Sequence, residues 1–333
     1  MAESRPSDYD ADHSYALWTV APARLDIRTE TVPPPGPGEV RVRTLASGVS
    51  RGTESLVFQG LVPESEWQRM RAPFQVGDFP FPVKYGYACV GRIEAPAALA
   101  SAQPVFVLHP HQSLFNVPLS ATVPVPETVP PARAVLAANM ETALNGLWDG
   151  LPSPGDHIAV VGGGVVGLLV AALAAKIPAT TVTLVDVNPA RAALAEHFGL
   201  AFALPDAAPG DQDLVIHTSG AEAGLDTALS LAGMEATVLE MSWYGDRIVS
   251  AALGRAFHSR RLTLKSSQVG SIPPTHRPRW THRRRIKTAL ALLADPRFDR
   301  LLESPIAFSD AATVLPEILS GRRDALAQVL VYQ

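Results

Sequence analysis

The stretch Val160-Val161-Gly162-Gly163-Gly164-Val165-Val166-Gly167 decides the fold of one half of this chain. It places three glycines in the spacing G-x-G-x-x-G, directly after an apolar run predicted as a strand over residues 157–161. The apolar residues that follow predict a helix over 165–175. A glycine pattern between a buried strand and a helix is the context in which this spacing indicates a dinucleotide site.

Each glycine of this spacing has a physical role in such a turn. Gly162 permits the tight turn, Gly164 lets the main chain approach a pyrophosphate, and Gly167 lets the helix pack closely on the strand. The first helical residues, Val165 and Val166, supply free N–H groups for the phosphates. We therefore expect these five residues to bind a dinucleotide cofactor.

The cofactor preference is read from the end of the next predicted strand, over 181–186. Asp186 stands nineteen residues after Gly167, where a carboxylate accepts hydrogen bonds from the ribose hydroxyls of NAD and repels the 2′-phosphate of NADP. NAD is the expected cofactor, with NADP less favoured. Arg191 either reaches back to the ribose or adenine edge or is an ordinary surface arginine.

Strands and helices alternate after residue 131. A helix is predicted over 132–147, and further strands over 213–217, 236–240 and 262–265, which is typical of a parallel sheet covered on both faces. The fold class is α/β, with a doubly wound Rossmann sheet in this part. We set this domain at 132–282.

The N-terminal part has a different pattern. Apolar residues alternate over 39–45, which predicts β structure, and four prolines over 123–131 mark a boundary. The predicted domains are a β-rich domain over 1–131, with a loose tail over 1–13, and a C-terminal return to it over 283–333. That return contains predicted helices at 286–293 and 311–319 and a strand at 327–331.

Composition restricts the function classes. The chain has 333 residues, 47% hydrophobic and 18% charged, with a net charge of -4, so it is globular and has no global positive field for nucleic acid or anionic lipid. We find no transmembrane run and no signal peptide. The single cysteine, Cys89, forms no internal disulfide and is predicted to be a small buried residue in a cytoplasmic protein.

Two further motifs carry a family resemblance. Residues 48–54 read Gly-Val-Ser-Arg-Gly-Thr-Glu, and residues 82–91 read Pro-Val-Lys-Tyr-Gly-Tyr-Ala-Cys-Val-Gly. With the glycine loop, they make nearly the whole chain resemble the medium-chain dehydrogenase/reductase superfamily, most of all its branch of hydroxyethyl bacteriochlorophyllide dehydrogenases. The resemblance implies a GroES-like catalytic domain, a small-molecule substrate and a homodimer.

The chain departs from its zinc-dependent relatives at the metal positions. Ser50 stands where they have cysteine, and Gly86-Tyr87-Ala88 where they have Gly-His-Glu, so we expect no zinc. Glu141 leaves one alternative open, an unusual metal site with His109, His111 and Glu54. A simpler reading makes Glu141 a glutamate in the first turn of its helix.

Without zinc, hydroxyl groups are the candidates for stabilising charge on the substrate oxygen. The resemblance would make Tyr87, Ser50 and Thr53 face the nicotinamide, and a neighbouring Arg51 or Lys84 would lower the pKa of Tyr87. Glu54 could orient Arg51. The alternative is that Tyr87 only packs and that Ser50 and Thr53 end a turn.

Loops after the later strands are the remaining candidates. Thr218, Ser219, Ser242 and Trp243 follow carboxyl ends of predicted strands and are expected to border the nicotinamide. The alternative for Trp243 and Tyr244 is an aromatic pair packed between domains. The basic run 277–285 either binds an anionic substrate or is a solvated loop and helix start.

The expected function is transfer of a hydride between NAD(H) and a secondary alcohol or its ketone, without zinc. Two alternatives stay open: an NADPH-dependent quinone or enoyl reductase of the same superfamily, and a non-catalytic dinucleotide-binding protein.

Overall fold

The computed structural model describes residues 13–332, and it forms two compact units. One unit comprises Met1–Val135 and Ser304–Gln333, and the other Leu136–Glu303. The loose tail predicted over 1–13 lies outside the described residues except for His13, which begins the first strand. No helix among residues 13–332 has the length and apolar character needed to span a bilayer.

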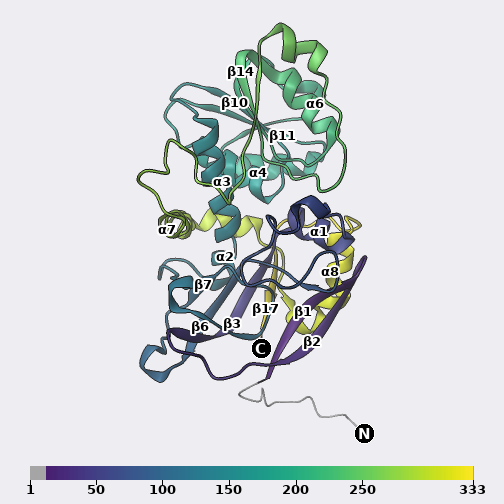
Figure 1. Ribbon diagram of the computed structural model, residues 1–333. Coiled ribbons are helices and arrows are strands. Elements are labelled where there is room, and N and C mark those ends of the chain that lie inside the picture. The colour runs from purple at the N-terminus through teal and green to yellow at the C-terminus, as the bar shows by residue number, and fades with distance from the viewer. Residues whose placement is uncertain (1–12, 333) are drawn as a thin grey trace. The chain divides into compact units, whose positions relative to one another are not determined.

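The second unit is built on a six-stranded parallel sheet in the order β12-β11-β10-β13-β14-β15 (Figure 1). This is the predicted doubly wound arrangement, in which strand order reverses between β10 and β13. Its central strands are apolar because both sheet faces are covered. The strands are β10 (His157–Val161), β11 (Thr181–Val185), β12 (Ala201–Ala203), β13 (Gln212–His217), β14 (Ala232–Glu240) and β15 (Thr263–Ser266).

Helices of the second unit pack on both faces of this sheet. α4 packs on β10 and β11, and α6 on β13 and β14; because the crossovers run outward in opposite directions, right-handed connections place them on opposite faces. The helices are α3 (Ala137–Gly150), α4 (Val165–Ala174), α5 (Ala192–Phe198), α6 (Glu222–Leu231) and α7 (His282–Leu292).

Two boundaries differ from the sequence prediction. The helix predicted over 132–147 is divided into α2 (Pro131–Ala134) and α3, and the units meet between residues 135 and 136. The return to the first unit begins at Ser304 rather than at 283. The physical reason is that α7 packs against α3, where its Arg285 is buried, so the segment 283–303 belongs to the second unit.

The first unit contains two sheets. A four-stranded sheet has the order β2-β1-β5-β4, and a larger sheet has the order β16-β17-β3-β6-β7-β9, with β8 also pairing to β3. The strands are β1 (His13–Ala21), β2 (Arg24–Thr31), β3 (Glu39–Val49), β4 (Val76–Gly77), β5 (Val83–Lys84), β6 (Cys89–Ala95), β7 (Val105–Val107), β8 (Leu114–Pro118), β9 (Val123–Pro124), β16 (Ile306–Ala307) and β17 (Gln328–Val331).

The C-terminal segment completes the core of the first unit. Strand β17 pairs antiparallel with β3, which places Leu330 opposite Ser47. Helix α8 (Ala311–Leu319) contacts α1 (Arg51–Gln59), and apolar side chains of both helices share one buried cluster with Leu330. This pairing brings the end of the chain to the strand that precedes the motif at 48–54.

Candidate functional site

The glycine loop has the geometry that a phosphate-binding turn needs. Gly162 lies at φ +113°, and a Cβ on it would sit 2.7 Å from the main-chain nitrogen of Ser219. A Cβ on Gly167 would collide with the carbonyl of Gly162. Gly164 is the N-cap residue of α4 and provides no side-chain cap, and a Cβ there would meet no heavy atom within 4 Å. The open space at Gly164 and the uncapped N–H groups of Val165 and Val166 fit a pyrophosphate.

Asp186 and Arg191 both border this loop. One carboxylate oxygen of Asp186 accepts the main-chain N–H of Gly163 at 2.5 Å, and the other accepts that of Asn188 at 2.7 Å. The Arg191 side chain packs against Gly163, since a Cβ there would lie 3.1 Å from its Cγ. The residues predicted to contact a ribose therefore lie beside the loop predicted to bind the phosphates.

Ser219, predicted to contact the cofactor, is held in place by the last residues of β13 and β14, which are His217 and Glu240. His217 is fully buried, with Nε2 2.6 Å from the Ser219 hydroxyl and Nδ1 2.7 Å from Glu240. The Glu240 carboxylate only accepts, so Nδ1 carries the proton and the Ser219 hydroxyl donates to Nε2. Gly224 makes room, because a Cβ there would collide with the Ser219 hydroxyl. Thr218 donates its hydroxyl to Gly162 at 2.9 Å.

The loop after β14 is tied to the same carboxylate. Burial acts to raise the pKa of Glu240, but hydrogen bonds from His217 and Ser242 hold it below its ordinary value. Tyr244 donates its hydroxyl to Glu240 at 3.0 Å, and burial, with this carboxylate, raises the pKa of Tyr244. The Ser242 hydroxyl accepts the N–H of Gly220 at 3.1 Å. Trp243, between Ser242 and Tyr244 in the chain, is half-buried. Because Glu240 and Ser242 hydrogen-bond to residues of both loops, the two predicted loops form one hydrogen-bonded group.

In the first unit, the structure brings Tyr87 together with Ser50 and Thr53. Ser50 precedes α1 and Thr53 lies in its first turn, and both side chains hydrogen-bond to Tyr87. Burial and the nearby Glu54 carboxylate raise the pKa of Tyr87 to about 12, although these two hydrogen bonds act to lower it. Tyr87 is therefore a neutral phenol near pH 7 and can donate a hydrogen bond.

The expected activation of Tyr87 by a cation is wrong. Arg51 pairs with Asp324 at 3.2 Å, and the Lys84 ammonium donates to Glu30 at 2.6 Å and to Gln112 at 2.7 Å. Both cations are neutralised by other partners, so burial decides the pKa of Tyr87.

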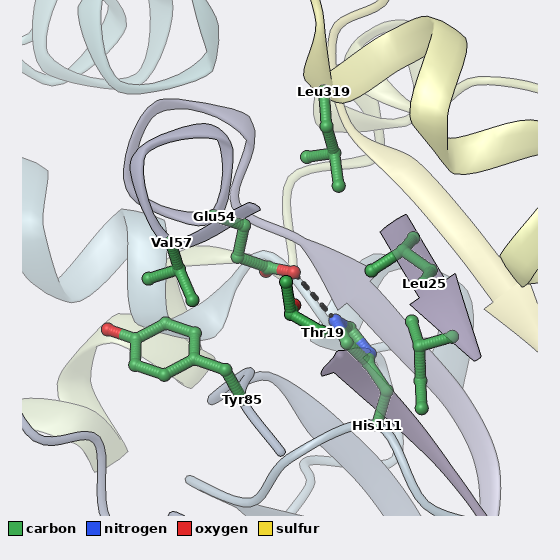
Figure 2. Close-up of a pocket in the computed structure, with 8 residues that line it drawn as sticks. Thr19, Leu25, Glu54, Val57, Tyr85, His111 and Leu319 are labelled. Atoms are coloured by element: carbon green, nitrogen blue, oxygen red, sulfur yellow. Dashed lines mark hydrogen bonds and ion pairs between the residues drawn. The ribbon is translucent and has the colours of Figure 1, made fainter. Parts of the chain in front are cut away.

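Glu54 has a different partner from the one expected. It binds the main-chain N–H of Ser50 at 2.7 Å through one oxygen and His111 Nε2 at 3.0 Å through the other, instead of orienting Arg51 (Figure 2). Gly86, at φ +121°, makes this possible, because a Cβ there would lie 2.9 Å from the His111 ring. The glycine before Tyr87 thus admits a histidine from a distant part of the chain.

The hydrogen bonds continue beyond His111 to residues that the sequence did not indicate. His111 Nδ1 lies 2.7 Å from the Ser47 hydroxyl, which lies 2.8 Å from the hydroxyl of Tyr332. Glu54, His111, Thr19 and Tyr85 also line a pocket of about 20 Å³, and the rest of its lining is apolar (Figure 2). No local pattern signals this cluster, because its members come from five separate segments of the first unit.

Two members of the alternative metal site, His109 and Glu141, have other partners in the described residues. His109 stacks on Phe115 with ring centroids 3.6 Å apart, and Glu141 lies in the second unit, paired with Arg285 at 2.9 Å. Glu141 also lies beyond the first turn of α3, so the helix-dipole reading is wrong too. Within residues 13–332, no three His, Cys, Asp or Glu side chains are grouped to hold a metal ion. Cys89 is buried, as predicted.

The basic run is mostly a solvated loop and helix start. Its exposed arginines include Arg284, whose guanidinium lies 3.9 Å from the ring centre of Trp280. Arg285 differs from its neighbours because it is 2% exposed and binds Glu141, Asn145 and Val269.

Comparison with known proteins supports the same fold. No protein-family model matches the chain. The chain is 26% identical over 285 residues to D-guloside 3-dehydrogenase of Escherichia coli strain K12, covering 77% of this chain and 81% of that protein.

Two solved structures show the same architecture. A dehydrogenase described as zinc-binding, from Sinorhizobium meliloti 1021 and bound to NADP, superposes with a TM-score of 0.75 at 21% identity, covering 96% of this chain and 99% of that one. An alcohol dehydrogenase of E. coli CFT073 complexed with NADH gives 0.74 at 17% identity, covering 96% and 100%.

These comparisons define the class of fold: the chain has an alcohol dehydrogenase-like fold, with a Rossmann-like parallel sheet and a β-rich unit. The similarity to D-guloside 3-dehydrogenase supports an oxidoreductase enzyme.

Proposed function

We propose that the protein transfers a hydride between NAD(H) and a secondary alcohol or its ketone, without a catalytic zinc ion. The observation that carries this proposal is the neutral Tyr87 phenol, held by Ser50 and Thr53 on the motifs where zinc-dependent relatives have metal ligands. A hydroxyl and a phenol are poor zinc ligands but good hydrogen-bond partners of a substrate oxygen.

The cofactor supplies the hydride chemistry, and the residues of this chain supply position and charge stabilisation. In the ketone direction, negative charge develops on the substrate oxygen as the hydride arrives. Tyr87 donates a hydrogen bond to that oxygen and then its proton, while Ser50 and Thr53 fix the direction of the phenol. In the alcohol direction, the same contacts hold the hydroxyl group that must lose its proton.

We further propose a preference for NAD over NADP. Asp186 supports it, because a carboxylate beside the glycine loop accepts ribose hydroxyls and repels a 2′-phosphate. The structural neighbours bind either NADP or NADH, so the choice rests on this residue alone.

A fluorescence titration with NADH and NADPH, on protein of measured metal content, is the first test. We expect tighter NADH binding, zinc far below one equivalent per chain, and turnover on a panel of secondary alcohols that includes D-gulosides. One tightly held zinc per chain would overturn the zinc-independent mechanism. Turnover of enones alone, with NADPH, would instead establish a double-bond reductase.

Substitution tests the role of Tyr87. Removing one preorganised donor to a developing oxyanion costs about 10²- to 10³-fold in kcat. We expect Tyr87→Phe to lose turnover on this scale and to keep its NADH affinity, because the glycine loop belongs to the other unit. Near-normal turnover of this variant would remove Tyr87 from the mechanism.

A further inference from the structure

Three side chains at the carboxyl ends of β13 and β14 form a line of hydrogen bonds to which the proposed hydride transfer assigns no step. The Ser219 hydroxyl lies 2.6 Å from Nε2 of His217, and Nδ1 of the same ring lies 2.7 Å from the Glu240 carboxylate. All three residues belong to the second unit. A hydroxyl beside a base that a third group orients is the arrangement of an activated nucleophile.

We propose that Ser219 is an activated nucleophile, that His217 is its general base, and that this site hydrolyses small carboxylic esters. Glu240 is a positioning residue, because it contacts the imidazole ring and acts on the serine only through it. This second activity requires no nicotinamide and is independent of the proposed hydride transfer.

Glu240 determines where the ring proton of His217 lies. Burial acts to raise the pKa of Glu240, but hydrogen bonds from His217 and Ser242 hold it below its ordinary value, so the group is a carboxylate near pH 7. A carboxylate only accepts, so Nδ1 carries the proton and Nε2 presents a lone pair to the Ser219 hydroxyl. A second hydrogen bond, from Tyr244 at 3.0 Å, fixes the carboxylate. The ring therefore has the tautomer that can take up the serine proton.

The line of three residues runs from a buried base to an exposed nucleophile. The side chain of His217 is 0% exposed and that of Glu240 is 14% exposed, whereas Ser219 is exposed. The backbone at Gly224 makes this approach possible, because a Cβ there would lie 2.7 Å from Nε2 of His217 and would collide with the Ser219 hydroxyl. A small ester can thus reach the hydroxyl while the base stays shielded from water.

Two donors beside Ser219 are suited to stabilise negative charge. The main-chain N–H of Ala221 donates to the Ser219 oxygen at 3.2 Å, which favours the loss of its proton. The guanidinium of Arg247 donates to the carbonyl of Gly220, the next residue, at 3.1 Å. This exposed cation is available to stabilise the oxyanion that forms when a serine oxygen adds to a carbonyl.

The proposed reaction balances with water as the only co-reactant. The Ser219 oxygen forms a bond to the ester carbonyl carbon as Nε2 of His217 takes the hydroxyl proton. The bond between that carbon and the alcohol oxygen then breaks, and the departing alcohol takes the proton from Nε2. Water adds to the acyl group on Ser219, with Nε2 again accepting a proton, and the carboxylic acid leaves as that proton returns to the serine oxygen.

Reaction with p-nitrophenyl acetate and with a fluorophosphonate tests the nucleophile. We expect release of p-nitrophenol, and peptide mass spectrometry should find the acetyl and phosphonyl groups on Ser219. Ser219→Ala should lose both modifications. The matched control is Ser230→Ala, which removes an exposed hydroxyl of α6 in the same unit and should react like the wild type.

Glu240→Gln tests the positioning role without a change of shape. The main-chain N–H of Ser242 donates to one Glu240 oxygen at 2.7 Å, so the glutamine oxygen must face Ser242 and its NH₂ group must face Nδ1 of His217. The ring proton then moves to Nε2, which no longer accepts from Ser219. We expect kcat/KM for the ester to fall by at least about 100-fold. Nitrogen-15 spectra should show the ring proton on Nδ1 in the wild type and on Nε2 in this variant.

A cysteine in place of the serine gives a measurement that needs no ester. A neighbouring histidine raises the thiolate fraction of a cysteine, so Ser219→Cys should be alkylated by iodoacetamide about tenfold faster than Ser230→Cys. The native Cys89 is buried and contributes no fast alkylation.

Each result supports or contradicts the proposal. Modification that spares Ser219, equal alkylation rates of the two cysteines, or an unchanged ring tautomer in folded Glu240→Gln would overturn this inference and leave the proposed function standing. A protein that oxidises no alcohol but acetylates Ser219 would overturn the proposed function and support this inference.

Discussion

Glu141 and Arg285 form a buried ion pair in the second unit, and replacing Glu141 should lower the free energy of unfolding more than replacing Arg285. Arg285 donates from Nε to Glu141 at 2.9 Å and from its two other nitrogens to Asn145 and to the carbonyl of Val269, each at 2.5 Å. Its side chain is 2% exposed and that of Glu141 is 7% exposed. The pair joins α3 to α7 and fixes the loop after β15.

The expected loss of unfolding free energy depends on which charge stays buried without its partner. Glu141→Leu leaves a guanidinium that cannot lose its proton, and an uncompensated buried charge costs about 3–5 kcal/mol. Arg285→Leu leaves a carboxyl whose pKa burial already raises in spite of Arg285. That carboxyl can take up a proton, so the cost should be nearer the 1–3 kcal/mol of an unsatisfied polar group. The double variant should cost less than the sum of the two, because it strands no charge.

Urea unfolding at pH 7, followed by the fluorescence of Trp148 in the second unit, measures all three free energies. In Arg285→Leu the raised pKa of Glu141 also makes the free energy of unfolding depend on pH. The stabilisation is fully present below the unfolded-state pKa of Glu141 and is lost as pH rises through the folded-state value. A cost below about 1 kcal/mol for Glu141→Leu, or a larger cost for Arg285→Leu, would refute this reasoning.

Three other substitutions have defined outcomes. Asp186→Ser should weaken NADH binding and improve NADPH binding, each by about tenfold, and fluorescence titration with both cofactors measures the change; an unchanged ratio would show that Asp186 does not contact the ribose. Gly167→Ala places a Cβ against the Gly162 carbonyl, so NADH binding should be lost while circular dichroism of the β-rich unit persists, and normal binding would contradict the close packing of α4 on β10. Burial lowers the pKa of His109 from 6.5 to about 3, so on acidification the unfolded state takes up a proton before the folded state does. The free energy of unfolding should therefore fall by up to about 1.4 kcal/mol per pH unit as pH drops from 6.5 toward 3. Urea unfolding of His109→Phe should show a weaker dependence of this free energy on pH, and an identical dependence would place the proton uptake elsewhere.

The second unit was largely predictable because its signals are local. The glycine spacing, the strand before it and the helix after it are contiguous in the chain, and Asp186 follows at the distance that one βαβ step requires. The predicted strands at 157–161, 181–186 and 213–217 agree with β10, β11 and β13 to within one residue.

The polar cluster of the first unit was only half predictable. Tyr87, Ser50 and Thr53 lie on two motifs, and the structure joins them. His111 reaches Glu54 across 57 residues and Ser47 reaches Tyr332 across 285, contacts that depend on tertiary pairing rather than on any periodicity. The partners of Arg51 and Lys84 were misjudged for the same reason, since proximity in sequence to Tyr87 does not determine which acid each cation meets.

The contact between Ser47 and Tyr332 has a consequence for how the protein is made. Residues 136–303 form the second unit as one uninterrupted segment inside the first. During translation, at about 5–20 residues per second, the inserted unit can fold on the ribosome while the outer unit still lacks β17 and α8. Until those elements arrive, apolar side chains such as Leu17, Val49 and Phe58 lack the C-terminal members of their cluster. The nascent chain should therefore depend on chaperones most while its outer unit waits, and a circular permutant that joins residues 304–332 to the front of β1 should shorten that interval.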